Sequence, residues 1–155
     1  MTITRHRERP FILWVLTSIL ALIFFALSAL HFYWASGKPW GMASSIPTTT
    51  TGKPLFTPGP GACALVGMGL LGLGSFYVLW SGLVPVILPG WIFTVGGIVV
   101  PSIFALRAVG EFRYVGFFKQ IKGTRFATMD TRVYSPLCLT IAAMGFAVRF
   151  ASLKG

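Results

Sequence analysis

Charged side chains are absent from long stretches of this 155-residue sequence. Residues 54–106 contain no Asp, Glu, Lys or Arg, and residues 10–37 and 133–148 contain none either. A helix that crosses a lipid bilayer needs about 20 consecutive apolar residues, so the longest stretch has room for two such helices and a turn. The pattern excludes a soluble globular domain and predicts a membrane protein with four spans.

Acidic residues and cysteines are scarce as well. Glu8, Glu111 and Asp130 are the only acids, against thirteen Lys and Arg, and the net charge is +10. The basic residues flank the apolar stretches, so we expect anionic lipid headgroups as their partner and no nucleic acid. Cys63 and Cys138 lack the spacing of redox or metal motifs. We therefore predict no metal and no cofactor, and leave open whether the two cysteines form a disulfide.

The apolar stretches predict an all-α integral membrane fold, with four transmembrane helices in an up-down bundle. We place these helices at about residues 11–35, 62–81, 91–110 and 136–150. The first apolar stretch is longer than the roughly 7–15 residues of a signal peptide core, so we expect an uncleaved helix. The whole chain, residues 1–155, is then predicted to be a single membrane domain.

Two polar segments are predicted to lie together on one face of this bundle. Residues 36–61 contain five prolines and four consecutive threonines, which predict a long irregular connector. Residues 111–135 form a basic amphipathic loop, and Ser135-Pro136 is typical of the start of a helix. Apolar residues of this loop have the i, i+3, i+4, i+7 spacing of a short interfacial helix, namely Tyr114, Phe117, Phe118 and Ile121.

The candidate ligand-binding residues all fall on this loop face. Aromatic residues at the end of the first helix and in the connector would form a wall, and arginines after the third helix would form a basic rim. This combination fits an amphiphile with an anionic head, such as a lipid or an isoprenoid phosphate. The predicted ligand-binding residues are Tyr33, Trp34, Trp40, Arg107, Arg113 and Arg132.

Alternative functions stay open at this point. His31 is a candidate acid or base that Glu111 or Asp130 would orient, which would make the protein an intramembrane enzyme acting on a lipid-like substrate. A small transporter is a weaker alternative, and a homo-oligomer or a membrane partner is compatible with each function. Two ion pairs are expected, one between Arg107 and Glu111 and one between Asp130 and either Arg125 or Arg132.

Two motifs resemble those of an uncharacterised family of small bacterial four-helix membrane proteins. Residues 31–35 match H-x-Y-W-A. The second motif has two parts: residues 107–119 match R-x-x-G-[DE]-F-R-x-x-G-F-F-K, and residues 124–138 match T-x-F-A-x-x-D-T-R-x-Y-S-P-L-C. Glu111 stands where the family more often has Asp. The resemblance implies a four-helix membrane topology and implies no reaction.

The expected location is the bacterial cytoplasmic (inner) membrane, which the chain crosses several times. Four spans put both termini on one side, with five Lys and Arg, and both long loops on the other, with eight. Basic residues concentrate on the cytoplasmic side of membrane proteins, so this bias favours termini outside the cytoplasm. Three arginines before the first helix favour the opposite orientation.

Overall fold

The computed structural model describes residues 11–85 and 88–154, and this part of the chain is helical without strands. Within these described residues, four helical segments are long and apolar enough to cross a membrane, and the last of them extends from Arg125 to Leu153. The predicted all-α fold with four spans is confirmed. The elements in chain order are α1 (Phe11–Ala35), α2 (Met42–Ser45), α3 (Pro60–Ser81), α4 (Gly90–Val109), α5 (Arg125–Met129), the π-helix η1 (Asp130–Tyr134) and α6 (Ser135–Lys154).

The first three spans lie close to their predicted positions. α1 covers the same residues as the first predicted helix, and α3 begins at Pro60, where a proline is tolerated in a first turn. α4 begins and ends one residue earlier than predicted. The arginines before α1, at residues 5–9, lie outside the described residues, so their contribution to orientation stays a prediction.

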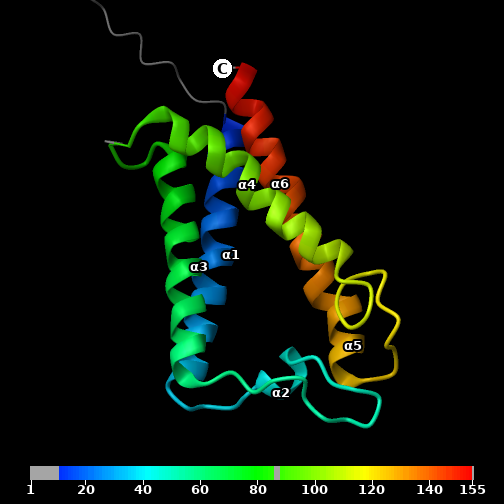
Figure 1. Cartoon of the computed structure of the whole chain (residues 1–155). Coiled ribbons are helices and arrows are strands. Elements are labelled where there is room, and N and C mark those ends of the chain that lie inside the picture. Colours follow the sequence, from blue (N-terminus) through cyan, green and yellow to red (C-terminus); the bar gives the residue numbers. More distant parts are fainter. Residues whose placement is uncertain (1–10, 86–87, 155) are drawn as a thin grey trace, which may run out of the picture.

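The helices are arranged as two pairs that meet at one end and separate at the other (Figure 1). α1 packs along α3, and α4 packs along α6. The pairs meet near the end of α6, and α2 lies at the opposite, open end, which we call the loop face. The buried core joins both pairs and consists of Leu13, Leu20, Ala21, Phe24, Tyr77, Trp80, Val100, Ile141 and Val148.

Small residues allow α1 and α3 to approach closely. A Cβ atom added at Gly74 would lie 2.5 Å from the ring of Phe25, and Gly67 would meet Phe32 at 3.3 Å. The Ser28 hydroxyl donates a hydrogen bond of 2.8 Å to the carbonyl oxygen of Gly67. Small residues and interhelical hydrogen bonds are the usual means of helix association in lipid.

The fourth span begins earlier than predicted. Ser135 is not its N-cap, because α5, η1 and α6 form a continuous helical run, which Thr124 caps by accepting a hydrogen bond from the Ala127 N–H. The Ser135 N–H bonds to the carbonyl of Asp130, five residues back, which is the π-helical spacing. Pro136 follows at once and has no N–H to continue the α-helical ladder. A π-turn lets the helix continue across this defect.

The predicted interfacial helix at residues 114–121 is wrong. This segment is irregular and folds back onto the end of α4, where the Phe117 N–H donates to the carbonyl of Ala108 at 2.9 Å. Gly110, Phe112 and Gly116 all have positive φ, which interrupts a right-handed helix. The connector at residues 36–61 is mostly irregular, as predicted, but it also contains the short helix α2.

Candidate functional site

A buried ionic cluster holds the loop face together, and we call it the Asp130 cluster. It consists of Arg107, Gly116, Lys119, Asp130 and Thr131. Asp130 is fully buried, and its Oδ1 accepts a hydrogen bond of 2.9 Å from Arg107 Nη2. Its Oδ2 accepts from the Gly116 N–H at 2.8 Å and from Lys119 Nζ at 3.0 Å. A single carboxylate therefore joins the end of α4, the folded loop and η1.

Lys119 is also buried, with 4% of its surface exposed, against 0% for the Asp130 residue that it contacts. Its ammonium group also donates to the carbonyl of Gly116 at 2.8 Å and to Thr131 Oγ1 at 2.7 Å. An ammonium group has three protons, so these acceptors and Asp130 use all of them. Lys119 is therefore a structural cation with no donor left for a ligand.

Both predicted ion pairs of this region are wrong. Asp130 pairs with Arg107 and Lys119 instead of Arg125 or Arg132. The Glu111 carboxylate, predicted to pair with Arg107, accepts a hydrogen bond from the Tyr114 N–H in its own loop. The reason is the fold of the loop, which brings Lys119 back beneath α4, while the start of η1 places Asp130 between Lys119 and Arg107.

Two glycines of the motif at residues 107–119, which we call the arginine motif, make this fold of the loop possible. Gly110 and Gly116 have φ of +88° and +89°, and their backbones cross in close contact. A Cβ atom at Gly110 would lie 1.8 Å from the carbonyl oxygen of Val115, and one at Gly116 would lie 2.3 Å from that of Val109. Glycine is required at both positions for its backbone freedom and for its lack of a side chain.

Three adjoining cavities lie on the loop face between the two helix pairs, and we call them together the cleft. We name each after a residue that lines it. The Arg125 cavity measures about 680 Å³, the Glu111 cavity about 530 Å³ and the Cys63 cavity about 280 Å³. The residues that line these cavities come from α1, the connector with α2, the start of α3, the end of α4, the following loop, and the helical run from α5 to η1.

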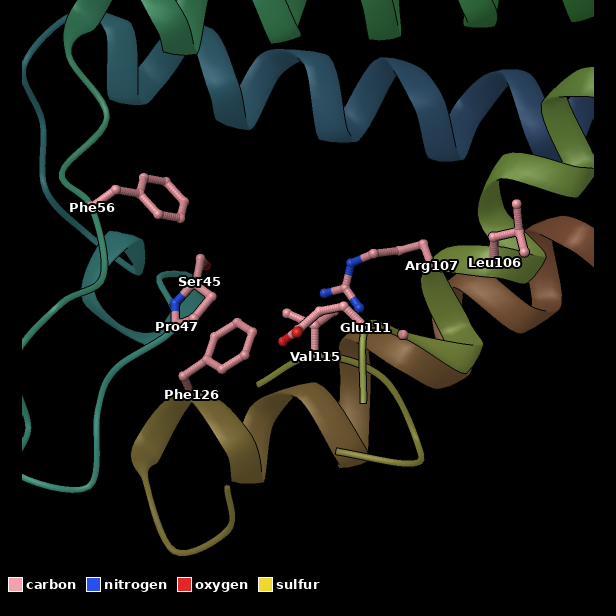
Figure 2. Close-up of a pocket in the computed structure, with 9 residues that line it drawn as sticks. Ser45, Pro47, Phe56, Leu106, Arg107, Glu111, Val115 and Phe126 are labelled. Atoms are coloured by element: carbon pink, nitrogen blue, oxygen red, sulfur yellow. The ribbon is translucent and has the colours of Figure 1, made fainter. Parts of the chain in front are cut away.

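Arg107 is the charged residue at the centre of the cleft. It lines both the Arg125 cavity and the Glu111 cavity, and its side chain extends from α4 into the space between α1 and α5 (Figure 2). Its Nη2 is held by Asp130, whereas its buried Nη1 has no hydrogen-bond partner among the described residues. A buried donor without a partner is costly, so this nitrogen is suited to donate a hydrogen bond to a ligand oxygen.

Aromatic side chains form the other walls of the Arg125 cavity. His31, Trp34, Trp40 and Tyr134 all line it. Trp34 is almost buried, and its Nε1 donates to the carbonyl of Trp40 at 2.9 Å, which ties the connector to the end of α1. The imidazole of His31 makes an edge contact with Trp34, with ring centroids 4.9 Å apart.

The remaining predicted binding residues lie elsewhere. Tyr33 is exposed beneath the ammonium group of Lys38, and Arg113 is exposed beside the ring of Tyr114. Arg132 is exposed on η1, and none of the three lines the cleft as described. Sequence reasoning missed Tyr134 and gave Arg125 a different role. Both lie in the motif at residues 124–138, which was the available signal.

No hydrogen bond joins the catalytic candidates His31, Glu111 and Asp130 to one another among the described residues. Nδ1 of His31 shares a hydrogen bond of 2.8 Å with the carbonyl of Leu27, and no carboxylate of the described residues is hydrogen-bonded to this imidazole. Both oxygens of Asp130 are occupied within its cluster. Among residues 11–85 and 88–154 no group of His, Cys, Asp or Glu could hold a metal ion, and Cys63 and Cys138 are free thiols.

Comparison with known proteins identifies the family to which this sequence belongs. Residues 24–145 match the sequence model of DUF3995, described as a protein of unknown function. No curated protein and no solved structure gives a match. The matched range contains both motifs, the Asp130 cluster and every residue that lines the cleft. The chain is thus a four-span membrane protein that belongs to the DUF3995 family of unknown function.

Proposed function

We propose that this protein binds a membrane-resident amphiphile with an anionic head in the cleft. The observation that supports this proposal most strongly is Arg107. Its Nη2 is held by Asp130, and its buried Nη1 has no hydrogen-bond partner within residues 11–85 and 88–154. A guanidinium group binds carboxylate or phosphate through charge-assisted hydrogen bonds, which are about twice as strong as neutral ones. An anionic oxygen beside Nη1 would therefore satisfy the donor that the protein leaves unpaired.

The charges around the Arg125 cavity favour an anion over a cation. Arg107 and Arg125 both line it, and the Asp130 carboxylate behind Arg107 is also neutralised by Lys119. Glu111 lines the neighbouring cavity and keeps the site from being uniformly basic. The excess positive charge supports a head with negative charge, and the apolar surroundings strengthen the attraction because they screen it less than water does.

The apolar walls of the cleft support a ligand with a hydrocarbon tail. Leu27 and Leu30 of α1 line the Arg125 cavity, and Leu106 of α4 lines the Glu111 cavity. Leu27 lies eight residues before the end of α1, which is about 12 Å along a helix that rises about 1.5 Å per residue. The cleft therefore extends from the loop face into the depth of the apolar spans, where a tail would be in contact with lipid.

The proposed location is the bacterial inner membrane with the loop face in the cytoplasm. Eight of the thirteen Lys and Arg belong to this face, which favours that orientation. A reporter enzyme that is active only outside the cytoplasm, fused after Gly155, is then expected to be active. If that reporter is inactive, and a second reporter that is active only in the cytoplasm is active at the same position, the orientation is the opposite one. The binding proposal would be unaffected.

Ligand retention tests the binding proposal. The protein is purified in mild detergent and its co-purifying lipids are measured by native mass spectrometry and by extraction. Arg107→Gln and Arg125→Gln are expected to lower the retained anionic lipid roughly tenfold, because each removes a charge-assisted hydrogen bond. The control variant Arg132→Gln removes the same charge from a residue that, unlike Arg107 and Arg125, lines none of the three cavities, and it should retain lipid like the wild type.

Two results would contradict the proposal. One is the absence of any bound amphiphile from the wild-type protein after gentle purification and after incubation with an anionic lipid. The other is equal loss from all three arginine variants, which would show general surface attraction of headgroups instead of a site in the cleft. Thermal unfolding of each variant establishes that lost binding is not lost folding.

A further inference from the structure

The short helix α2 borders all three cavities of the cleft. Ser45, its last residue, lines the Arg125 cavity, the Glu111 cavity and the Cys63 cavity. Among the described residues, Ser45 alone lines all three cavities. Figure 1 shows α2 at the loop face between the two separated helix pairs. α2 thus lies where the three cavities adjoin, together with side chains that each line two of them, namely Arg107, His31, Trp34 and Phe56.

Tyr134 provides the side-chain hydrogen bonds that join α2 to the helical run from α5 to η1. The Tyr134 hydroxyl lies 3.0 Å from Ser45 Oγ and donates to the carbonyl of Ser44 at 3.3 Å. The chain on either side of α2 turns at Gly41 and Gly52, which have positive φ and no atoms within 4 Å of an added Cβ. Ser44 and the adjacent Ile46 are buried, so α2 itself is packed, whereas the glycine turns that flank it are positions where the backbone can change direction at low cost.

We infer that α2 is a displaceable plug and that the ligand of the joined cleft is lipid-sized. This inference rests on the proposed function for the identity of the ligand. The Arg125 cavity alone, at about 680 Å³, falls within the range of roughly 300–1,000 Å³ that is typical of small-molecule sites. When α2 moves, the Glu111 and Cys63 cavities join it, and the resulting space exceeds what a headgroup alone requires.

Tyr134 is the positioning residue of this device. It belongs to η1, the same five-residue π-turn that begins with Asp130. Asp130 holds Arg107 at one end of the turn and Tyr134 holds α2 at the other. A ligand oxygen that binds Nη1 of Arg107, while Asp130 holds Nη2, therefore acts on the turn that also carries Tyr134. The π-turn connects head recognition to opening of the cleft.

Cys63 provides a native reporter of the plug. It is 3% exposed and lines the cavity that Met42 and Ser45 of α2 cover. We expect Tyr134→Phe to raise the rate of Cys63 alkylation by N-ethylmaleimide about fivefold, the factor that one net hydrogen bond contributes to an opening equilibrium. The ring of Tyr134 and its contact with Phe126, at 6.2 Å between centroids, are preserved in this variant.

The controls use the same reagent on the whole protein in detergent. Tyr33→Phe removes an exposed hydroxyl away from the cleft and should leave the Cys63 rate unchanged. Cys138, on α6, reports general loosening. A Cys63 rate that Tyr134→Phe leaves within twofold of the wild type overturns the plug, and so does a parallel rise at both cysteines. This readout needs no ligand, so failure of the lipid-retention test and failure of the plug are distinguishable.

Discussion

Replacement of Asp130 by alanine is expected to destabilise the protein by about 3–5 kcal/mol, the usual cost of removing one partner from a buried ion pair. Lys119 would keep its charge with only 3% of its side chain exposed and no anion beside it. The Gly116 N–H would lose its acceptor at the same time. The free energy of unfolding, measured by denaturant titration in mixed micelles, is the quantity to compare with the wild type.

Two further variants separate the buried charge from other effects. Glu111→Ala removes the other acid of the loop face, which is exposed, and should cost less than about 1 kcal/mol. Adding Lys119→Met to Asp130→Ala removes the unpaired cation and should restore much of the lost stability. The Asp130 cluster would lose its assigned role if Asp130→Ala and Glu111→Ala had equal effects, or if the second substitution gave no recovery.

The spans could be predicted from the sequence because lipid imposes a simple rule on it. Long uncharged stretches have few alternatives to a spanning helix, so the bounds of α1, α3 and α4 differ from prediction by two residues or fewer. The start of the fourth span was missed for a local reason. Ser135-Pro136 is typical of a helix start, but here the π-turn at residues 130–134 allows the helix to continue through these two residues. A π-turn has no clear signature in amino-acid composition.

The partners of the charged residues could not be predicted because they depend on tertiary structure. Arg107 and Glu111 are four apart in the sequence, yet the helix ends at Val109, so the local pairing rule does not apply to them. Asp130 finds Lys119 only because the loop folds back at Gly110 and Gly116. The arginine motif thus has a physical explanation, since its first arginine, its two glycines and its lysine build one cluster.

The loop-face location of the candidate site was predictable, but its residues were only partly so. The topology placed His31, Trp34, Trp40 and Arg107 on one face, and all of them line the cleft. Whether each of them binds a ligand stays a prediction. Helical periodicity gave no means of distinguishing Arg132, which is exposed, from residues directed inward, because the π-turn shifts the register of the faces after Asp130.

The second large effect is expected for Gly116→Ala, which should lower the free energy of unfolding by at least about 3 kcal/mol, because backbone strain and overpacking add. The new Cβ atom would lie 2.3 Å from the carbonyl oxygen of Val109 and 2.5 Å from Gly110 Cα, and neither is the mobile end of a side chain. The matched control is Gly52→Ala. Gly52 also has a positive φ, but an added Cβ there meets nothing within 4 Å.

The difference between these two alanine variants isolates the close contact from the backbone angle. Gly52→Ala should cost only the strain of a left-handed conformation, about 1–2 kcal/mol, whereas Gly116→Ala must also separate the loop from α4. Equal losses would mean that the crossing of Gly110 and Gly116 tolerates a side chain. A larger loss at Gly116 accompanied by lost lipid retention would connect the crossing to the site, because the Gly116 N–H holds the carboxylate that positions Arg107.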